Sequence, residues 1–194
     1  GITITHTKAA AMDAAKLQAV LDNIITVTGV VSYTHSDDVT AVNFSKLSSA
    51  GTLEIDAEQA ISLPELSTVT GEFKVVDDNK VTSFSAPKLT SVGNFNDGAN
   101  DHDLTLSRAT SIDLSALSYY DAVTNLEVTG NALSAGWDLD MPLFQTKTSA
   151  GVTRGAFTLT IGGYVNLVEL DAMTSSADTI AAPLANKVVL DNFQ

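Results

Sequence analysis

Two stretches of the sequence carry the same pattern. Residues 61–71 read Ile-Ser-Leu-Pro-Glu-Leu-Ser-Thr-Val-Thr-Gly, and residues 84–93 read Phe-Ser-Ala-Pro-Lys-Leu-Thr-Ser-Val-Gly. In both, an apolar residue, a serine and a second apolar residue precede a proline, and leucine, valine and glycine follow in that order. The alternation of apolar and polar residues predicts a short strand. The proline predicts that the strand ends at a bend.

The same pattern recurs along most of the chain. Its first apolar position is occupied by Val42, Ile61, Phe84, Ile112, Leu139, Leu170 and Leu190, at steps of 19 to 31 residues. Second apolar strands are predicted at residues 53–55, 73–75, 104–106, 126–128 and 157–161. Short strands repeated at this period predict a solenoid, because no single coil buries its apolar face alone. We expect a mainly β, right-handed solenoid of about seven irregular coils with short parallel strands over residues 39–194.

Residues 1–38 have a different pattern and are predicted to form a strand and helix cap. Lys8 to Asn23 is rich in alanine and shows one apolar stripe, which predicts an amphipathic α-helix. Ile24 to Val31 is rich in β-branched residues and predicts a strand. We expect the helix to cover the N-terminal end of the stacked core, and the alternative is a helix that binds a partner.

The repeat resembles the leucine-rich-repeat-like, receptor-L-domain-like solenoids of bacterial cell-surface proteins. Residues 63–71 and 86–93 carry this resemblance. The fixed asparagine of standard leucine-rich repeats is absent, and the coil length is irregular. The resemblance implies a solenoid fold and extracellular recognition or adhesion, and it transfers no catalytic residue and no specific ligand.

Composition narrows the classes of function. The 194 residues include 23 acidic and 10 basic side chains, a formal net charge of -13. This charge argues against binding to nucleic acid and to anionic membrane surfaces. No apolar run approaches the ~18 residues of a membrane span. The absence of cysteine excludes disulfides and thiol chemistry, and the hydroxyl-rich, lysine-poor composition predicts an extracellular or cell-surface protein.

Side chains between the inward positions are predicted to point outward, because side chains alternate across a strand. In the C-terminal coils this outward face is acidic, with the candidate ligand-binding residues Asp113, Asp138, Asp140, Glu169 and Asp171. Neighbouring like charges repel unless a cation, sugar hydroxyls or a basic partner offsets them. The alternatives are a solvated face that prevents edge pairing and a glycosidase-like carboxylate pair.

Three longer segments, 94–103, 118–124 and 145–155, are predicted to be loops that project from one edge of the solenoid. The first is rich in oxygen ligands suited to Ca²⁺, with candidates Asn96, Asp97, Asn100, Asp101 and Asp103. An ordinary polar loop is the alternative, because the spacing does not match an EF-hand. Candidate stacking platforms for sugars are Tyr119, Tyr120, Trp137 and Tyr164.

Three hypotheses of function follow from these patterns. The first is a non-catalytic extracellular recognition or adhesion module that binds glycan or protein through the outward strand face or the loop edge. The second is a structural subunit of an extracellular filament or lattice, in which copies assemble through an open solenoid end at residues 188–194. The third is a polysaccharide-active β-helix enzyme. The sequence has isolated histidines, no Gly-x-Ser-x-Gly elbow and no P-loop, so no catalytic residue is assigned.

Overall fold

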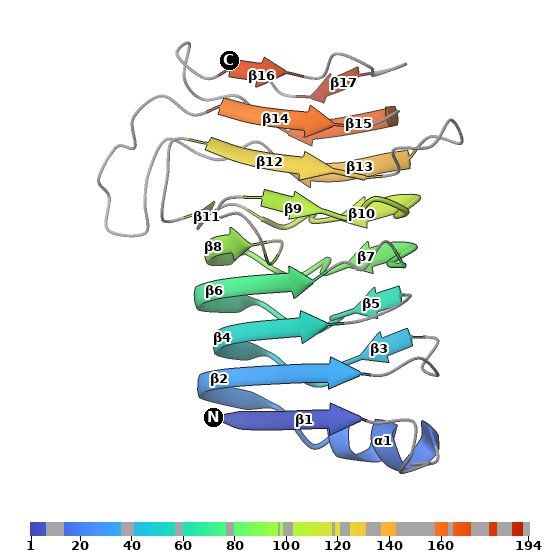
Figure 1. The fold of residues 1–194 in the computed structure, drawn as a ribbon. Coiled ribbons are helices and arrows are strands. Elements are labelled where there is room, and N and C mark those ends of the chain that lie inside the picture. Colours follow the sequence, from blue (N-terminus) through green and yellow to red (C-terminus); the bar gives the residue numbers. More distant parts are fainter. Residues whose placement is uncertain are drawn as a thin grey trace.

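The computed structural model shows a mainly β solenoid of stacked parallel strands with one helix (Figure 1). The two chain ends lie at opposite ends of the stack. The structure describes residues 1–6, 14–35, 41–56, 60–76, 80–96, 98, 103–117, 119–120, 125–130, 137–142, 158–162, 165–171, 179–181 and 188–191. Every strand pair within this part of the chain is parallel, as predicted.

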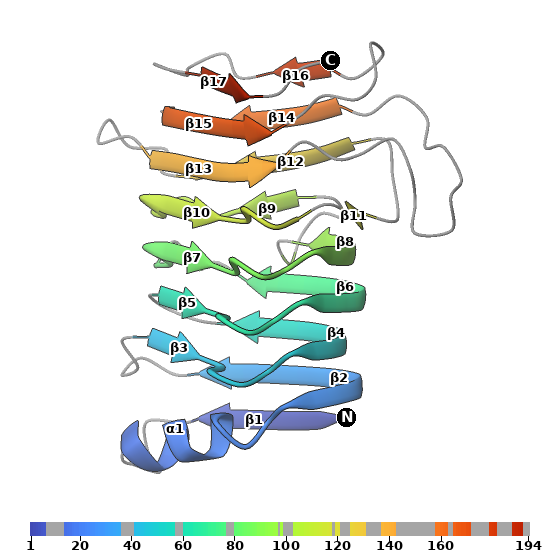
Figure 2. The same ribbon diagram turned by 180° about the vertical axis from the view of Figure 1, so that it is seen from behind.

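The strands form three sheets. Sheet A contains, in spatial order, β1 (Ile2–His6), β2 (Thr26–His35), β4 (Ser49–Asp56), β6 (Thr68–Val76), β8 (Ser91–Asn96) and β11 (Tyr119–Tyr120). Sheet B contains β3 (Ala41–Asn43), β5 (Ala60–Ser62), β7 (Ser83–Ser85), β10 (Ser111–Asp113), β13 (Trp137–Pro142), β15 (Val165–Asp171) and β17 (Val188–Asp191). Sheet C contains β9 (Asp103–Thr105), β12 (Asn125–Thr129), β14 (Thr158–Gly162) and β16 (Thr179–Ala181). Figure 2 shows sheet B running along the whole stack.

A tight turn after each of the first four strands of sheet B explains the repeated proline and leucine. The amide of Leu66 donates to the carbonyl of Leu63, and the amide of Leu89 donates to the carbonyl of Ala86. Proline favours the second position of such a turn, because its ring fixes the φ angle that this position needs. The same bond recurs in the neighbouring coils, from Leu47 to Phe44 and from Leu117 to Leu114.

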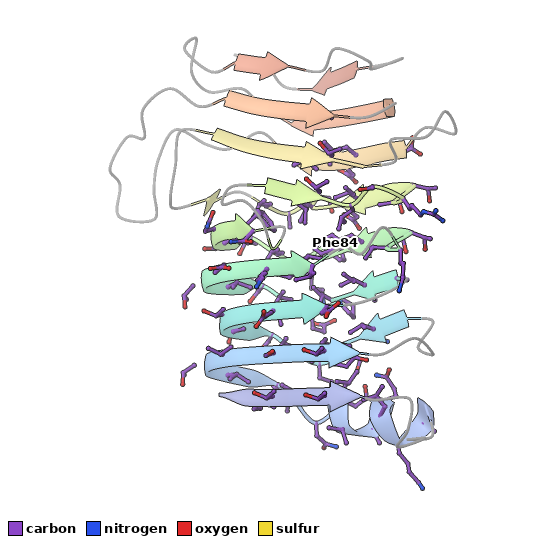
Figure 3. The ribbon with its side chains drawn as sticks, viewed as in Figure 1. Phe84 is labelled. Atoms are coloured by element: carbon purple, nitrogen blue, oxygen red, sulfur yellow. The ribbon has the colours of Figure 1, made fainter. Side chains whose placement is uncertain are left out.

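The predicted apolar columns form the core. The first column is buried at Val42, Ile61, Phe84, Ile112 and Leu139. The leucines that end the turns, Leu47, Leu66, Leu89 and Leu117, are completely buried. Figure 3 labels Phe84, which lies inside the stack and contacts Phe73 of sheet A with ring centroids 5.7 Å apart. The core therefore joins sheets A and B through the side chains that the repeat specifies.

A column of glycines marks a bend in sheet A. The register shifts next to Gly51 in β4, Gly71 in β6 and Gly93 in β8, so that each strand bulges at the same level. A Cβ atom on Gly51 would lie 2.4 Å from the carbonyl oxygen of Thr28 in the coil before it. The backbone approach is therefore too close for any side chain, which explains the glycine that ends the repeated pattern.

Helix α1 (Ala14–Leu21) lies next to β3 at the N-terminal end of sheet B. Leu17 and Leu21 are buried in the core. The side-chain amide of Gln18 donates to the backbone carbonyl of Asn43, 2.9 Å away. Asp22, just after the helix, accepts hydrogen bonds from Gln18 and from the Ser45 hydroxyl. The described helix falls within the predicted range, whose first residues, 8–13, lie outside the described residues.

Two predicted loops contain strands instead. Asn94 to Asn96 belong to β8, and Phe95 is completely buried against Phe73. Tyr119 and Tyr120 form β11, which pairs with β8. The second strand predicted at residues 104–106 overlaps β9, which pairs with β12 and not with sheet A. It begins sheet C, which in Figure 1 continues on the side of the stack that sheet A forms near the N-terminus.

Candidate binding face

The outward side of sheet B carries two columns of short side chains, which together we call the sheet B face. One column is in direct register from strand to strand and contains Asn43, Ser62, Ser85, Asp113 and Asp140. The other contains Ala41, Ala60, Ser83, Ser111 and Asp138. The central residue of each strand is buried between them. Both columns agree with the prediction from β3 to β13.

The face changes character along the stack. In β5 and β7 its outward positions hold alanine and serine, all of them half-buried. In β10 and β13 they include Asp113, Asp138 and Asp140. Asp138 and Asp140 are exposed and Asp113 is half-buried. Because short side chains line the approach, these carboxylates are accessible from the neutral end of the face.

Asp113 is held by hydrogen bonds from three donors. Its Oδ1 accepts from the Ser115 amide at 3.1 Å and from the Ser115 hydroxyl at 2.8 Å. Its Oδ2 accepts from the Ser85 hydroxyl, 3.3 Å away on the neighbouring strand. An aspartate that accepts from the residue two positions later closes a local turn that stiffens the backbone. Asp113 is therefore an oriented carboxylate, and the Asp-x-Ser spacing is the sequence signal for it.

Asp113 and Asp140 are direct cross-strand neighbours. Adjacent strands lie about 4.8 Å apart, which brings two carboxylates onto one small area. Asp138 lies two residues before Asp140 and on the same side of β13. Like charges placed directly opposite each other oppose strand pairing. The pairing persists here, and the Ser85 and Ser115 donors partly offset the charge of Asp113.

The predicted positions of Glu169 and Asp171 were wrong by two residues. The sequence pattern aligned Asp171 with Asp140, but in the structure Glu169 pairs with Asp140 and Asp171 pairs with Pro142. The acidic column therefore continues as Asp113, Asp140 and Glu169, while Asp171 pairs with Asp191 of β17. A displacement of two residues leaves both at positions that alternate with the inward ones, as expected for outward residues. Their side chains lie outside the described part of the structure.

The structure places only part of the candidate calcium loop. Asn96 is the last residue of β8, and its side-chain oxygen accepts a 2.6 Å hydrogen bond from the amide of Gly98. Gly98 has a positive φ of 95°, which favours glycine. Asp103 begins β9. Asp97, Asn100 and Asp101 lie outside the described residues, and among the residues that are described no group of three or more acidic or histidine side chains is arranged to hold a metal.

The candidate aromatic platforms that the structure describes belong to two different sheets. Tyr119 and Tyr120 belong to sheet A, whereas Trp137 is the first residue of β13 in sheet B. The side chains of these three residues are outside the described part of the chain, as is the whole of Tyr164. Stacking on sugars therefore stays a prediction.

Comparison with family models, curated proteins and solved structures finds no match to this chain. Within the described part, no helix is long and apolar enough to cross a membrane. The sheet B face and the two ends of the stack are therefore the features from which we infer a function.

Proposed function

We propose that this protein is a non-catalytic recognition or adhesion module of a microbial surface, built as a right-handed solenoid of seven leucine-rich-repeat-like coils with α1 as its N-terminal cap. The observation that carries the proposal is the in-register pair Asp113 and Asp140, set in an outward face of short side chains. Within the described strands, the short side chains of this face leave room for a flat ligand. The ligand is a glycan or a basic segment of a protein, because both present donors to a row of fixed carboxylates.

The orientation of Asp113 supports recognition. Its hydrogen bonds with Ser115 and Ser85 hold the carboxylate in place before any ligand arrives. Preorganised acceptors cost less conformational entropy on binding than mobile side chains. Asp140 lies in the same column on the next strand, so a linear glycan laid along the stack meets the two carboxylates about 4.8 Å apart.

Endless head-to-tail assembly receives less support from the contacts at the N-terminal end. A filament that extends sheet B needs the edge of β3 to pair with β17 of the next copy. Helix α1 lies at that edge, and Gln18 already hydrogen-bonds the carbonyl of Asn43. A helix at this place opposes growth of the sheet, as the end caps of other solenoids do.

The test compares two variants that each remove one negative charge. Asp140→Asn changes the sheet B face, and Glu72→Gln changes a half-buried position on sheet A. A glycan array identifies a ligand, and titration calorimetry then measures its affinity with and without Ca²⁺. We expect Asp140→Asn to lower the affinity on the order of tenfold, as for the loss of a charged hydrogen bond, while Glu72→Gln leaves it unchanged.

Equal effects of the two variants would contradict the proposed face. Turnover of a polysaccharide on the same array would support the enzyme hypothesis instead. If the unmodified chain binds the glycan only when Ca²⁺ is present, the carboxylates bind the cation and do not contact the glycan directly.

A further inference from the structure

The N-terminal end of the stack has one covered edge and one free edge. Helix α1 covers the edge of β3 in sheet B with Leu17, Leu21 and the Gln18 hydrogen bond. Strand β1 is the corresponding outer strand of sheet A, and among the described strands it pairs only with β2. Among the described residues no side chain hydrogen-bonds to its outer edge. An edge of this kind presents backbone donors and acceptors to another strand.

Exposed apolar side chains gather at the same end. The exposed large hydrophobic residues of the described part are Ile2, Val20, Ile25 and Val30, with 36% to 57% of each surface accessible. Ile2 and Ile4 occupy the inward columns beneath Val31 and Tyr33. No described strand covers the other side of these two residues. Ile2 and Ile4 are therefore members of the core columns that a further strand would bury.

Charge separates this end from the rest of the molecule. Residues 1–35 contain Lys8 and Lys16 against Asp13 and Asp22, so their formal charge sums to zero. The whole net charge of -13 therefore belongs to residues 36–194. Two copies of an acidic protein repel each other through most faces. The N-terminal end is where that repulsion is weakest.

We propose that this end binds a second copy of the chain, with β1 of each copy pairing antiparallel about a two-fold axis. The sequence of β1 is complementary to itself, since the register that places Thr3 opposite Thr3 also places Ile2 opposite Ile4 of the second copy. The inward isoleucines then cover one another, and the uncharged threonines lie together outside. A two-fold dimer uses the same patch twice and is closed, unlike a head-to-tail array.

The position of α1 favours this arrangement over head-to-tail continuation of the solenoid. The helix lies near the C-terminal end of β1, on the side of β3 (Figures 1 and 2). A two-fold rotation normal to sheet A moves the second helix to the opposite end of the paired strands, away from the first helix. Continuation of the solenoid by translation would place β17 of the next copy against the helix.

The experiment uses the absence of cysteine in this chain. Thr3→Cys adds a thiol at an exposed outward position of β1, and Thr70→Cys adds one at an exposed position of β6 as the matched control. Any disulfide joins two copies. We expect mild oxidation to cross-link Thr3→Cys almost completely and Thr70→Cys very little, because paired strands bring opposite Cβ atoms to about 4.5–5.5 Å.

A charge substitution gives the second measurement. Ile2→Glu places two carboxylates across the two-fold axis, and Thr70→Glu adds the same charge elsewhere. Sedimentation of the unmodified chain should show a concentration-dependent dimer, and Ile2→Glu should raise its dissociation constant by on the order of tenfold or more. Thr70→Glu should leave it unchanged. Circular dichroism checks folding, and if Ile2→Glu does not fold, the cross-linking decides.

Three outcomes would overturn the inference. The first is a folded monomer at every concentration. The second is a dimer that Ile2→Glu does not weaken and Thr3→Cys does not cross-link. The third is a mass that grows without limit, which would instead support head-to-tail assembly. Glycan binding by the sheet B face is measured separately, so failure of one proposal leaves the other standing.

Discussion

Replacing Gly51 by alanine tests whether close backbone contact at the bulges holds successive coils together. A Cβ atom at position 51 would lie 2.4 Å from the carbonyl oxygen of Thr28 and 2.8 Å from that of Gly29. Both are backbone atoms of the preceding strand, so neither moves as a flexible side chain would. Gly29 itself is the matched control, because a Cβ there meets its nearest atom, the nitrogen of Gly1, at an ordinary 3.4 Å.

The expected loss of stability follows from this geometry. Relief of the contact at position 51 requires about 1 Å of extra separation between strands that normally lie about 4.8 Å apart. A shift of that size stretches the neighbouring ladder bonds, each with a net contribution of about 1 kcal/mol, and overpacking itself costs about 1–3 kcal/mol. Alanine regains about 0.4–1 kcal/mol by restricting the unfolded chain. We expect Gly51→Ala to lower the free energy of unfolding by about 2–4 kcal/mol.

Urea unfolding followed by circular dichroism measures this difference. Gly29→Ala should change the free energy of unfolding by less than about 1 kcal/mol in either direction, because it keeps the entropic gain without the clash. The two slopes against urea should agree, which shows that the native states bury similar areas. Gly51→Ala and Gly29→Ala variants of equal stability would refute the idea that close contact selects the glycine column.

Two further predictions concern side chains near the N-terminal end. Burial raises the pKa of Tyr33 to about 12, and its buried hydroxyl has no hydrogen-bond partner among the residues that the structure describes. Tyr33→Phe should therefore leave the free energy of unfolding unchanged or raise it by about 1–3 kcal/mol, and it should remove one late-ionising group from the tyrosine absorbance titration; a loss of stability would show that the hydroxyl is paired. Hydrogen bonds from Ser45 and then from Gln18 lower the pKa of Asp22 below its usual 3.8. The folded state thus prefers the carboxylate, and its stabilisation is present above about pH 4 and is lost as pH falls through the lower folded value. The difference in melting temperature between the natural chain and Asp22→Asn should shrink as pH falls from 6 to 3, and a difference that stays constant would contradict this role.

The repeat predicted the parts of the fold that depend on local chemistry. Apolar alternation located the strands of sheet B as far as β13, and the proline and leucine predicted the bend that the Leu63 to Leu66 turn forms. The prediction failed where only tertiary packing decides. Asn94 to Asn96 read as a polar loop because a single buried residue, Phe95, lies between two asparagines. The local sequence does not show that Phe95 packs against Phe73, which lies on a different strand.

The sequence pattern predicted which face of the sheet the acidic residues occupy. It did not predict which residue of the neighbouring strand each one pairs with. A slip of one residue would turn the apolar side chains of β15 to solvent, and the sequence pattern therefore excludes it. A slip of two residues keeps every side chain on its own face, so the pattern does not distinguish Glu169 from Asp171 as the neighbour of Asp140. In the structure Glu169 is the neighbour of Asp140, and the register is irregular between Trp137 and Asp138, which the sequence does not signal.

The arrangement of the three sheets explains why sheet B is the best place for a ligand. Sheet A ends at β11 and sheet C begins at β9, so the described strands on that side form two separate surfaces. Sheet B instead continues from β3 to β17 in one unbroken parallel ladder. From β3 to β13 its outward columns keep their strand-to-strand register, and the register irregularity lies beyond them, between β13 and β15. A long ligand that binds several coils at once needs such constant spacing, and the acidic residues of β10 and β13 lie on the sheet that supplies it.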